Sequence, residues 1–163
     1  MSPRWRGLVR AMSLVAALAQ LALLTACAPG TPDEGSWRLD ARHAVSDVSS
    51  QTAAVKLALD QERRGHVFAR YLQTVAVEAE ENAGASSEKF SATQPPAAET
   101  SRYSRVTDEL ERDTGLLADV RIAVVARRES EYAALAHQLA AASERLATLE
   151  RELEHAPGAA SHR

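Results

Sequence analysis

Apolar residues recur every three or four positions through most of this chain, from Trp37 to Leu153. That spacing places them along one face of an α-helix. In the first stretch the recurring positions are Ala41, Val45, Val48, Thr52, Val55 and Leu59, and in the second they are Phe68, Leu72, Val75 and Ala79. The pattern therefore predicts a body built from amphipathic helices.

The first helix is predicted to end at Gly65. The step from Leu59 to Phe68 is nine residues, about half a turn out of phase at 100° per residue, so one straight helix would not keep a single apolar face. Arg63 and Arg64 suit a helix C-terminus, and glycine suits the left-handed position that follows it. We therefore expect a break between the first two stripes.

The second helix is predicted to run from about residue 66 to residue 93, weakened at NAGASS (82–87), with Phe90 as its last large apolar contact. Pro95 and Pro96 lie in the segment QPPAAE and end it, because proline disfavours helix both at its own position and at the residue before it. This segment is the clearest loop in the body.

Two further apolar stripes follow this loop. The third contains Tyr103, Val106, Leu110, Leu117, Val120 and Val124, and the fourth contains Tyr132, Leu135, Leu139, Ala142, Leu146, Leu149 and Leu153. The fourth keeps a strict 3, 4 spacing over three heptads, which is a coiled-coil seam. We interpret this seam as part of the bundle core; the alternative is that it pairs with a second copy or with a partner's helix.

The boundary between the third and fourth helices is predicted within ARRESEY (126–132). Two arginines precede two glutamates there, an order that suits one helix ending and another beginning, with Ser130 as the N-cap. A weak internal repeat supports the break, since VKLALDQERRGH from Val55 aligns with VRIAVVARRESE from Val120 and places Gly65 opposite Ser130. A single stripe running straight through this segment is the alternative.

These patterns predict an all-α fold, an up-down four-helix bundle with helices about 40 Å long. The alternative is a pair of long antiparallel helices that bend back at Pro95 and Pro96 to form a coiled-coil hairpin. Aromatic residues make up 4% of the chain, and much of its apolar content is alanine. Such a composition favours thin, closely packed helices over a bulky enclosed pocket.

The chain begins with a basic segment followed by an apolar one. MSPRWRGLVR contains three arginines and no acidic residue, and the following residues 11–26 are nearly all alanine, leucine, valine and methionine. This order and length are typical of a secretory signal peptide, and the apolar run is too short for a good membrane span. We therefore exclude residues 1–26 from the predicted fold.

The apolar run ends in LTAC, where Cys27 is the single cysteine of the chain. This quartet resembles the lipobox of bacterial lipoproteins. The resemblance implies cleavage between Ala26 and Cys27, a diacylglycerol thioether on Cys27, and a lipidated N-terminus held in the membrane at its extracytoplasmic face. Several acyl chains together hold a protein firmly, since each buried methylene contributes about 0.8 kcal/mol.

Four segments follow from these signals: a signal peptide at 1–26, the lipidated cysteine with a flexible tether at 27–35, the helical bundle at 36–156 and a polar tail at 157–163. The tether is rich in proline, glycine and small polar residues. We expect the first helix to begin at Ser36, because Gly35 disfavours an earlier start. A start at Thr31 is the alternative, since a capping box begins there.

Residues 27–163 contain 16 Lys and Arg against 22 Asp and Glu, a formal charge of −6. This balance argues against a nucleic-acid partner, which would require a basic patch. The leader, VKLALDQERRG and the paired prolines resemble small helical lipoproteins of uncharacterised function from high-GC Gram-positive bacteria. That resemblance implies fold and location, and it implies no catalytic residue.

Candidate chemistry in the body is sparse. Glu152 and His155 have the Glu-x-x-His spacing of di-metal bundles, and Asp40 with His43 is an imperfect second copy. Both pairs lie near helix termini and away from the apolar stripes, so we predict neither a metal site nor a cofactor. The chain contains no G-x-S-x-G or S-x-x-K motif and no glycine-rich phosphate loop, and we predict no catalytic residue.

The sequence therefore favours a non-catalytic, membrane-anchored helical module for interaction or structure. Its expected partners are the membrane, through the lipid, and a protein or second copy that contacts a helical face. The alternative function is a ligand- or metal-binding lipoprotein accessory to transport or envelope maintenance.

Overall fold

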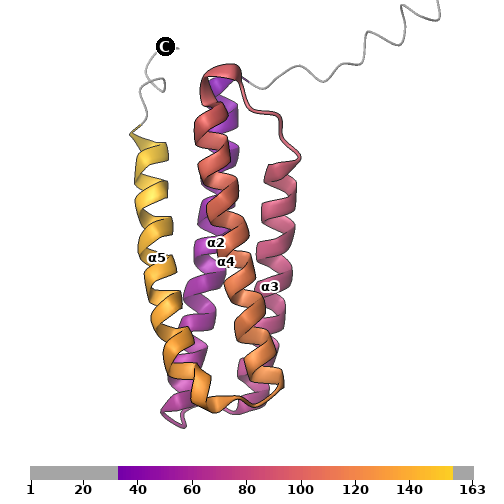
Figure 1. The fold of residues 1–163 in the computed structure, drawn as a ribbon, viewed down its shortest axis with the longest axis vertical. Helices are drawn as coiled ribbons and strands as arrows, with labels where there is room; N and C mark the ends of the chain where they lie inside the picture. Colours follow the sequence, from indigo (N-terminus) through magenta and orange to yellow (C-terminus); the bar gives the residue numbers. More distant parts are fainter. Residues whose placement is uncertain (1–32, 156–163) are drawn as a thin grey trace, which may run out of the picture. The chain divides into compact units, whose positions relative to one another are not determined.

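The chain forms a four-helix bundle in the part that the structure, a computed structural model, describes: residues 33–155 (Figure 1). The long helices are α2 (Glu34–Arg63), α3 (Ala69–Ser91), α4 (Thr100–Val125) and α5 (Tyr132–Glu154). Two short 3₁₀ helices, η1 (Ala97–Glu99) and η2 (Glu129–Glu131), precede α4 and α5. Successive helices run up and down, which confirms the predicted bundle.

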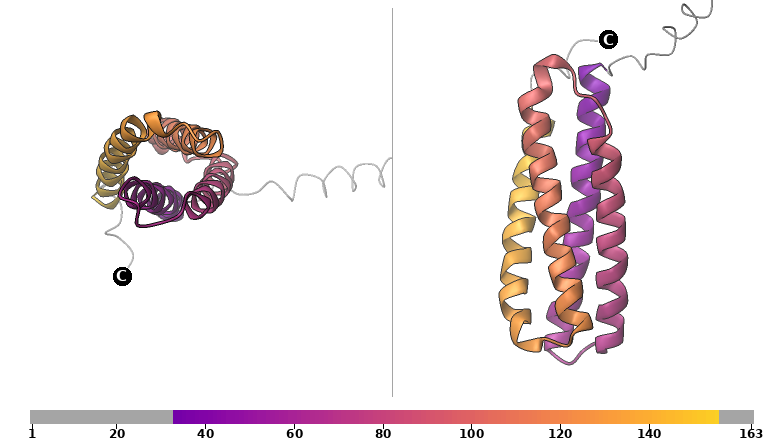
Figure 2. Two further views of the ribbon diagram at one scale, coloured as in Figure 1. Left: turned by 90° about the horizontal axis from the view of Figure 1, so that it is seen from below. Right: turned by 45° about the vertical axis from the view of Figure 1, so that its right-hand side comes forward.

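The four helices do not pack equally. α2 lies side by side with both α3 and α5, α3 packs along α4, and α2 also reaches α4 across the bundle (Figure 2). α4 and α5 pack less closely with each other than the other neighbouring pairs do. The seam between α4 and α5 is therefore the loosest of the bundle.

The apolar stripes fill the interior as the pattern predicts. All seven members of the heptad seam on α5 are buried, so this seam is part of the chain's own core. The largest fully buried apolar side chains come from all four helices: Trp37, Leu59, Leu72, Leu110, Leu117, Leu139 and Leu146. At one end of the core, the ring of Phe90 packs between those of Trp37 and Tyr103 in tilted arrangements, with ring centroids 5.9 and 5.6 Å away.

Helix α2 begins two residues before the predicted start at Ser36. Asp33 is its N-cap, and the Asp33 carboxylate accepts a hydrogen bond from the backbone N–H of Ser36 at 2.9 Å. An aspartate cap stabilises a helix start by about 1 kcal/mol, which offsets the cost of Gly35 in the first turn. Glu34 and Gly35, the last two residues of the predicted tether, therefore belong to α2.

The predicted break at Gly65 is confirmed. Gly65 has φ 73° and follows the last turn of α2. The N–H of His66 donates to the carbonyl of Gln61, and the N–H of Gly65 donates to the carbonyl of Glu62. This pair of bonds is a Schellman motif, in which a left-handed residue satisfies the last carbonyls of a helix.

The break between α4 and α5 is also confirmed, but its predicted cap at Ser130 is wrong. Ser130 lies inside η2, and α5 has no side-chain cap. Arg127, two residues after the end of α4, has φ 54°. The N–H of Arg127 donates to the carbonyl of Val124 and the N–H of Arg128 to that of Ala123, which is the same Schellman motif. The structural counterpart of Gly65 is therefore Arg127, because both have a positive φ and the same pair of backbone hydrogen bonds.

Three other expectations need correction. The alternative fold, a hairpin of two long helices, is wrong, because the chain breaks both between α2 and α3 and between α4 and α5. The second helix, predicted from about residue 66 to residue 93, is the shorter α3 (Ala69–Ser91), which continues through residues 82–87. Phe68, predicted to lie on the apolar stripe, precedes the first turn of α3 and is 86% exposed. Periodicity assigned Phe68 to a helix that begins only after it.

Candidate functional site

The loose seam between α4 and α5 contains two adjoining surface hollows. One hollow of about 700 Å³ lies toward the start of α4, and a second of about 540 Å³ continues along the seam. The two share Arg112, Ala141 and Arg145, so they form one groove, which we call the α4–α5 groove.

The α4–α5 groove is acidic. Six carboxylates and three arginines line it: Asp108, Glu109, Glu111, Asp119, Glu144, Glu152, Arg105, Arg112 and Arg145. Two of the arginines bridge the groove, since Arg145 of α5 pairs with Glu109 of α4, and Arg105 of α4 pairs with Glu152 of α5 at 3.0 Å. Arg112 pairs with Glu109 on its own helix. Every arginine of the groove is therefore already paired.

Asp113 is the unusual residue of this seam. Its side chain is fully buried, and its Oδ1 accepts a hydrogen bond from Nη2 of Arg145 at 3.0 Å. Its Oδ2 has no hydrogen-bond partner among residues 33–155. Burial, and after it the negative charge of Glu109, raise the pKa of Asp113 to about 6, although the positive charges of Arg145 and Arg112 act in the opposite direction. Asp113 thus sits behind the groove as a carboxylate whose charge is only partly compensated.

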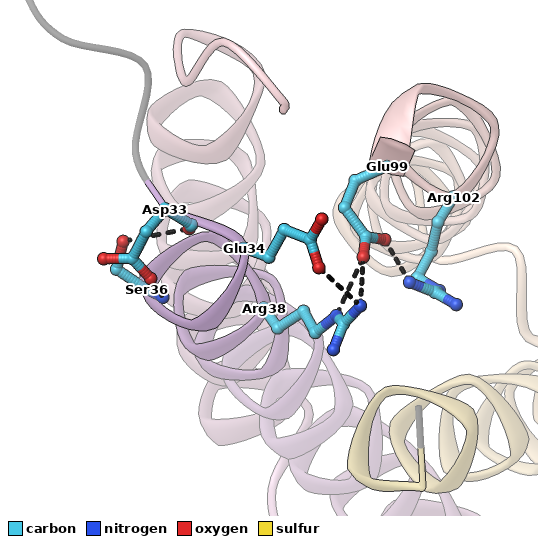
Figure 3. A network of polar contacts seen from close by, with 6 residues as sticks. All are labelled: Asp33, Glu34, Ser36, Arg38, Glu99 and Arg102. Atoms are coloured by element: carbon cyan, nitrogen blue, oxygen red, sulfur yellow. Dashed lines mark hydrogen bonds and ion pairs between the residues drawn. The ribbon is translucent and has the colours of Figure 1, made fainter. Parts of the chain in front are cut away.

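A second buried carboxylate holds the bundle together at the end where α2 begins. Glu99 is 1% exposed and lies between two arginines (Figure 3). Nε of Arg38 on α2 donates to Glu99 at 2.8 Å, Arg102 on α4 pairs with the other carboxylate oxygen, and Arg38 also approaches Glu34 at 3.4 Å. This network ties η1 to α2 and is structural, because its charges compensate one another.

The opposite end of the bundle exposes apolar side chains. Leu57 is 61% exposed, Phe68 86% and Tyr71 55%. Leu57 and Tyr71 line a hollow of about 390 Å³ between α2 and α3, together with Val67 and Val75. Exposed aromatic residues are enriched at protein interfaces, so this end is a second candidate contact surface.

The predicted lipidation site, Cys27, and the cleavage position after Ala26 lie outside the described residues. Of the weighed metal pairs, Glu152 is bound to Arg105, and Nδ1 of His155 lies 2.7 Å from the carbonyl oxygen of Arg151. Asp40 and His43 are exposed on α2 and line a small hollow against α3. Within residues 33–155, no three His, Cys, Asp or Glu side chains are grouped as a metal site requires.

Sequence reasoning missed the α4–α5 groove and the burial of Asp113 and Glu99. One signal for Asp113 was present, since it follows Val106 and Leu110 at steps of four and three on the same helical stripe. Glu99 lies in a predicted loop and gave no such signal. None of the helices in the described part is long and apolar enough to span a membrane.

No family model matches the chain, and neither a curated protein nor a solved structure matches it.

Proposed function

We propose that this protein is a lipid-anchored, extracytoplasmic helical module that acts by binding a protein partner. The observation that supports the binding role most strongly is the α4–α5 groove. A bundle of this kind normally closes all four seams with apolar side chains. Here one seam stays open and is lined by paired and unpaired charges, while the interior behind it is filled.

The proposed anchor is Cys27, six residues before the N-cap Asp33. Six extended residues reach about 20 Å, so a lipid on Cys27 would hold the start of α2 near the membrane. Helix α2 has 30 residues, and such a helix is about 45 Å long. The α4–α5 groove runs along this length of the bundle, between the helix that packs beside α2 and the helix that lies across from it.

Cross-linking in intact cells tests this proposal. The wild-type protein and Cys27→Ala are cross-linked, purified and analysed by mass spectrometry for proteins recovered in a fixed ratio. We expect a defined partner with the wild-type protein and its loss, or a large decrease, with Cys27→Ala. Absence of any stoichiometric partner from both forms would refute the binding role, and equal recovery from both would refute the need for the anchor.

A ligand-binding role is the second candidate, because about 700 Å³ is within the range of small-molecule sites. Thermal shift of the purified protein against metal ions and small molecules tests it. A ligand at 100 times its dissociation constant should stabilise the protein by about 2.7 kcal/mol. A hit that requires Glu144 or Arg145 would favour this role over the partner-binding one.

A further inference from the structure

The length of the α4–α5 groove matches a short helix. The groove runs from Arg105 to Asp119 on α4 and from Gln138 to Glu152 on α5. Fourteen residues of α-helix rise about 21 Å, so the groove accommodates about four turns of an added helix. Helix-in-groove docking is a common mode of peptide recognition, in which apolar anchors repeat every three or four residues.

The floor of the groove supplies apolar contact. Leu116 and Leu149 are each less than a tenth exposed, and Ala141, which lies in both hollows, is exposed. A small side chain at this central position leaves room for a large apolar residue of a partner. The anchors of a docked helix would therefore contact Ala141, Leu116 and Leu149.

The charge of the rim selects a cationic partner. Four exposed carboxylates of the groove have no ion pair among residues 33–155: Asp108, Glu111, Asp119 and Glu144. The arginines of the groove already pair with Glu109, Glu152 and Asp113, so these four carboxylates are the acidic groups left for a basic helix to contact. Such complementarity speeds association and rejects partners of the wrong charge.

Asp113 adds an independent observation behind the floor. Its side chain is fully buried, and one of its oxygens has no donor within the described chain. A buried carboxylate oxygen without a donor is costly. Arg145, which pairs with Asp113, also lines the groove, so this one side chain connects the buried carboxylate with the groove.

We propose that the α4–α5 groove binds a basic amphipathic helix of about 14 residues in a partner protein. This inference rests on the proposed partner-binding function and names its surface and the chemistry of the partner. Apolar residues of the partner helix pack on Leu116, Ala141 and Leu149, and its lysines and arginines pair with the free carboxylates of the rim.

A designed peptide tests the inference on the purified chain. The probe is an 18-residue peptide with leucine at alternating steps of three and four and with lysine or arginine elsewhere. Two control peptides have the same residues in scrambled order, or glutamate in place of every basic residue. We expect the basic amphipathic peptide to bind with a micromolar dissociation constant at low salt, and both controls to bind at least 10-fold more weakly.

Matched charge reversals locate the binding. Asp108→Lys with Glu144→Lys changes the groove, and Glu81→Lys with Glu88→Lys makes the same charge change on exposed residues of α3 that line none of the described hollows. We expect the groove pair to weaken binding at least 10-fold and the α3 pair less than 3-fold. Equal weakening by both pairs would overturn the inference, because it would show binding to net charge alone.

A measurement on the unmutated chain covers the case in which the groove variant does not fold. In NMR titration with the basic peptide, the amides of Ala141 and Thr148 should shift and those of Ser86 and Glu88 should not. No shift at 1 mM peptide, or shifts confined to α3, would overturn the inference. Cross-linking of a partner that contacts another surface would overturn it as well and would leave the proposed partner-binding function intact.

Discussion

Asp113→Asn should abolish a specific pH dependence of stability. In the folded chain the pKa of Asp113 is raised from 3.8 to about 6, first by burial and then by the negative charge of Glu109. The folded state therefore holds a proton at pH values where the unfolded state has released it. This stabilisation is fully present below the unfolded pKa and is lost as the pH rises through the folded pKa of about 6.

The magnitude follows from the two pKa values. A difference from 3.8 to about 6 corresponds to about 3 kcal/mol over the whole pH range, of which about 1.4 kcal/mol falls between pH 5 and pH 7.5. For a domain of this size, that part raises the melting temperature by roughly 5 °C. When the pH is lowered from 7.5 to 5, the unfolding free energy of the wild-type chain should therefore rise by about 1.4 kcal/mol more than that of Asp113→Asn.

Urea denaturation at both pH values, followed by circular dichroism, measures this difference. Asp119→Asn is the matched control, because Asp119 is an exposed carboxylate on the same helix. The control should retain the wild-type difference between pH 5 and pH 7.5. If the difference between pH 5 and pH 7.5 is unchanged in Asp113→Asn, the burial of this carboxylate has no energetic consequence and the expected linkage is absent.

Three further predictions concern the fold. Arg127→Gly should stabilise the chain by about 1 kcal/mol in urea denaturation, because glycine adopts the positive φ of this helix end without strain. Gly65→Ala should destabilise it by a similar amount for the same reason. A change of the same sign in both variants would contradict the role of positive φ at these helix ends. Glu99→Ala should cost about 3 kcal/mol, since it leaves two arginines without their buried partner, and a cost below 1 kcal/mol would show that the network is dispensable. Leu139→Ala should cost about 3 kcal/mol and Phe68→Ala less than about 0.5 kcal/mol in the same assay, and similar costs would contradict the assigned burial.

Periodicity predicted the parts of the fold that depend on burial of a helical face. The stripe on α5 is a strict heptad, and all of its members are buried. A continuous apolar face of this kind is removed from water by packing against neighbouring helices. Gly65 was predictable because glycine adopts a left-handed cap at little cost. Arg127 was not, since the side chain gives no sign that its backbone adopts φ 54°.

The candidate site was harder to predict for a physical reason. Whether α4 and α5 close their seam depends on the packing of all four helices, and no local pattern encodes it. Asp113 lies on the apolar stripe, but its burial is tolerated only because Arg145 reaches it from another helix. The partner of Glu99 on α2 is 61 residues away in sequence. Pairs between residues so far apart in the sequence are identified only from the structure.

Photo-cross-linking from one position in the groove shows whether a partner protein docks between α4 and α5. A photoreactive residue replaces Ala141, which lies on the groove floor, or Ala85, which is exposed on α3, in the lipidated protein in intact cells. We expect the residue at position 141 to cross-link to one discrete partner protein, within a basic helical segment of that partner, and the residue at position 85 to give no cross-linked protein. A cross-link from Ala85 alone, or the same products from both positions, would contradict a docking groove between α4 and α5.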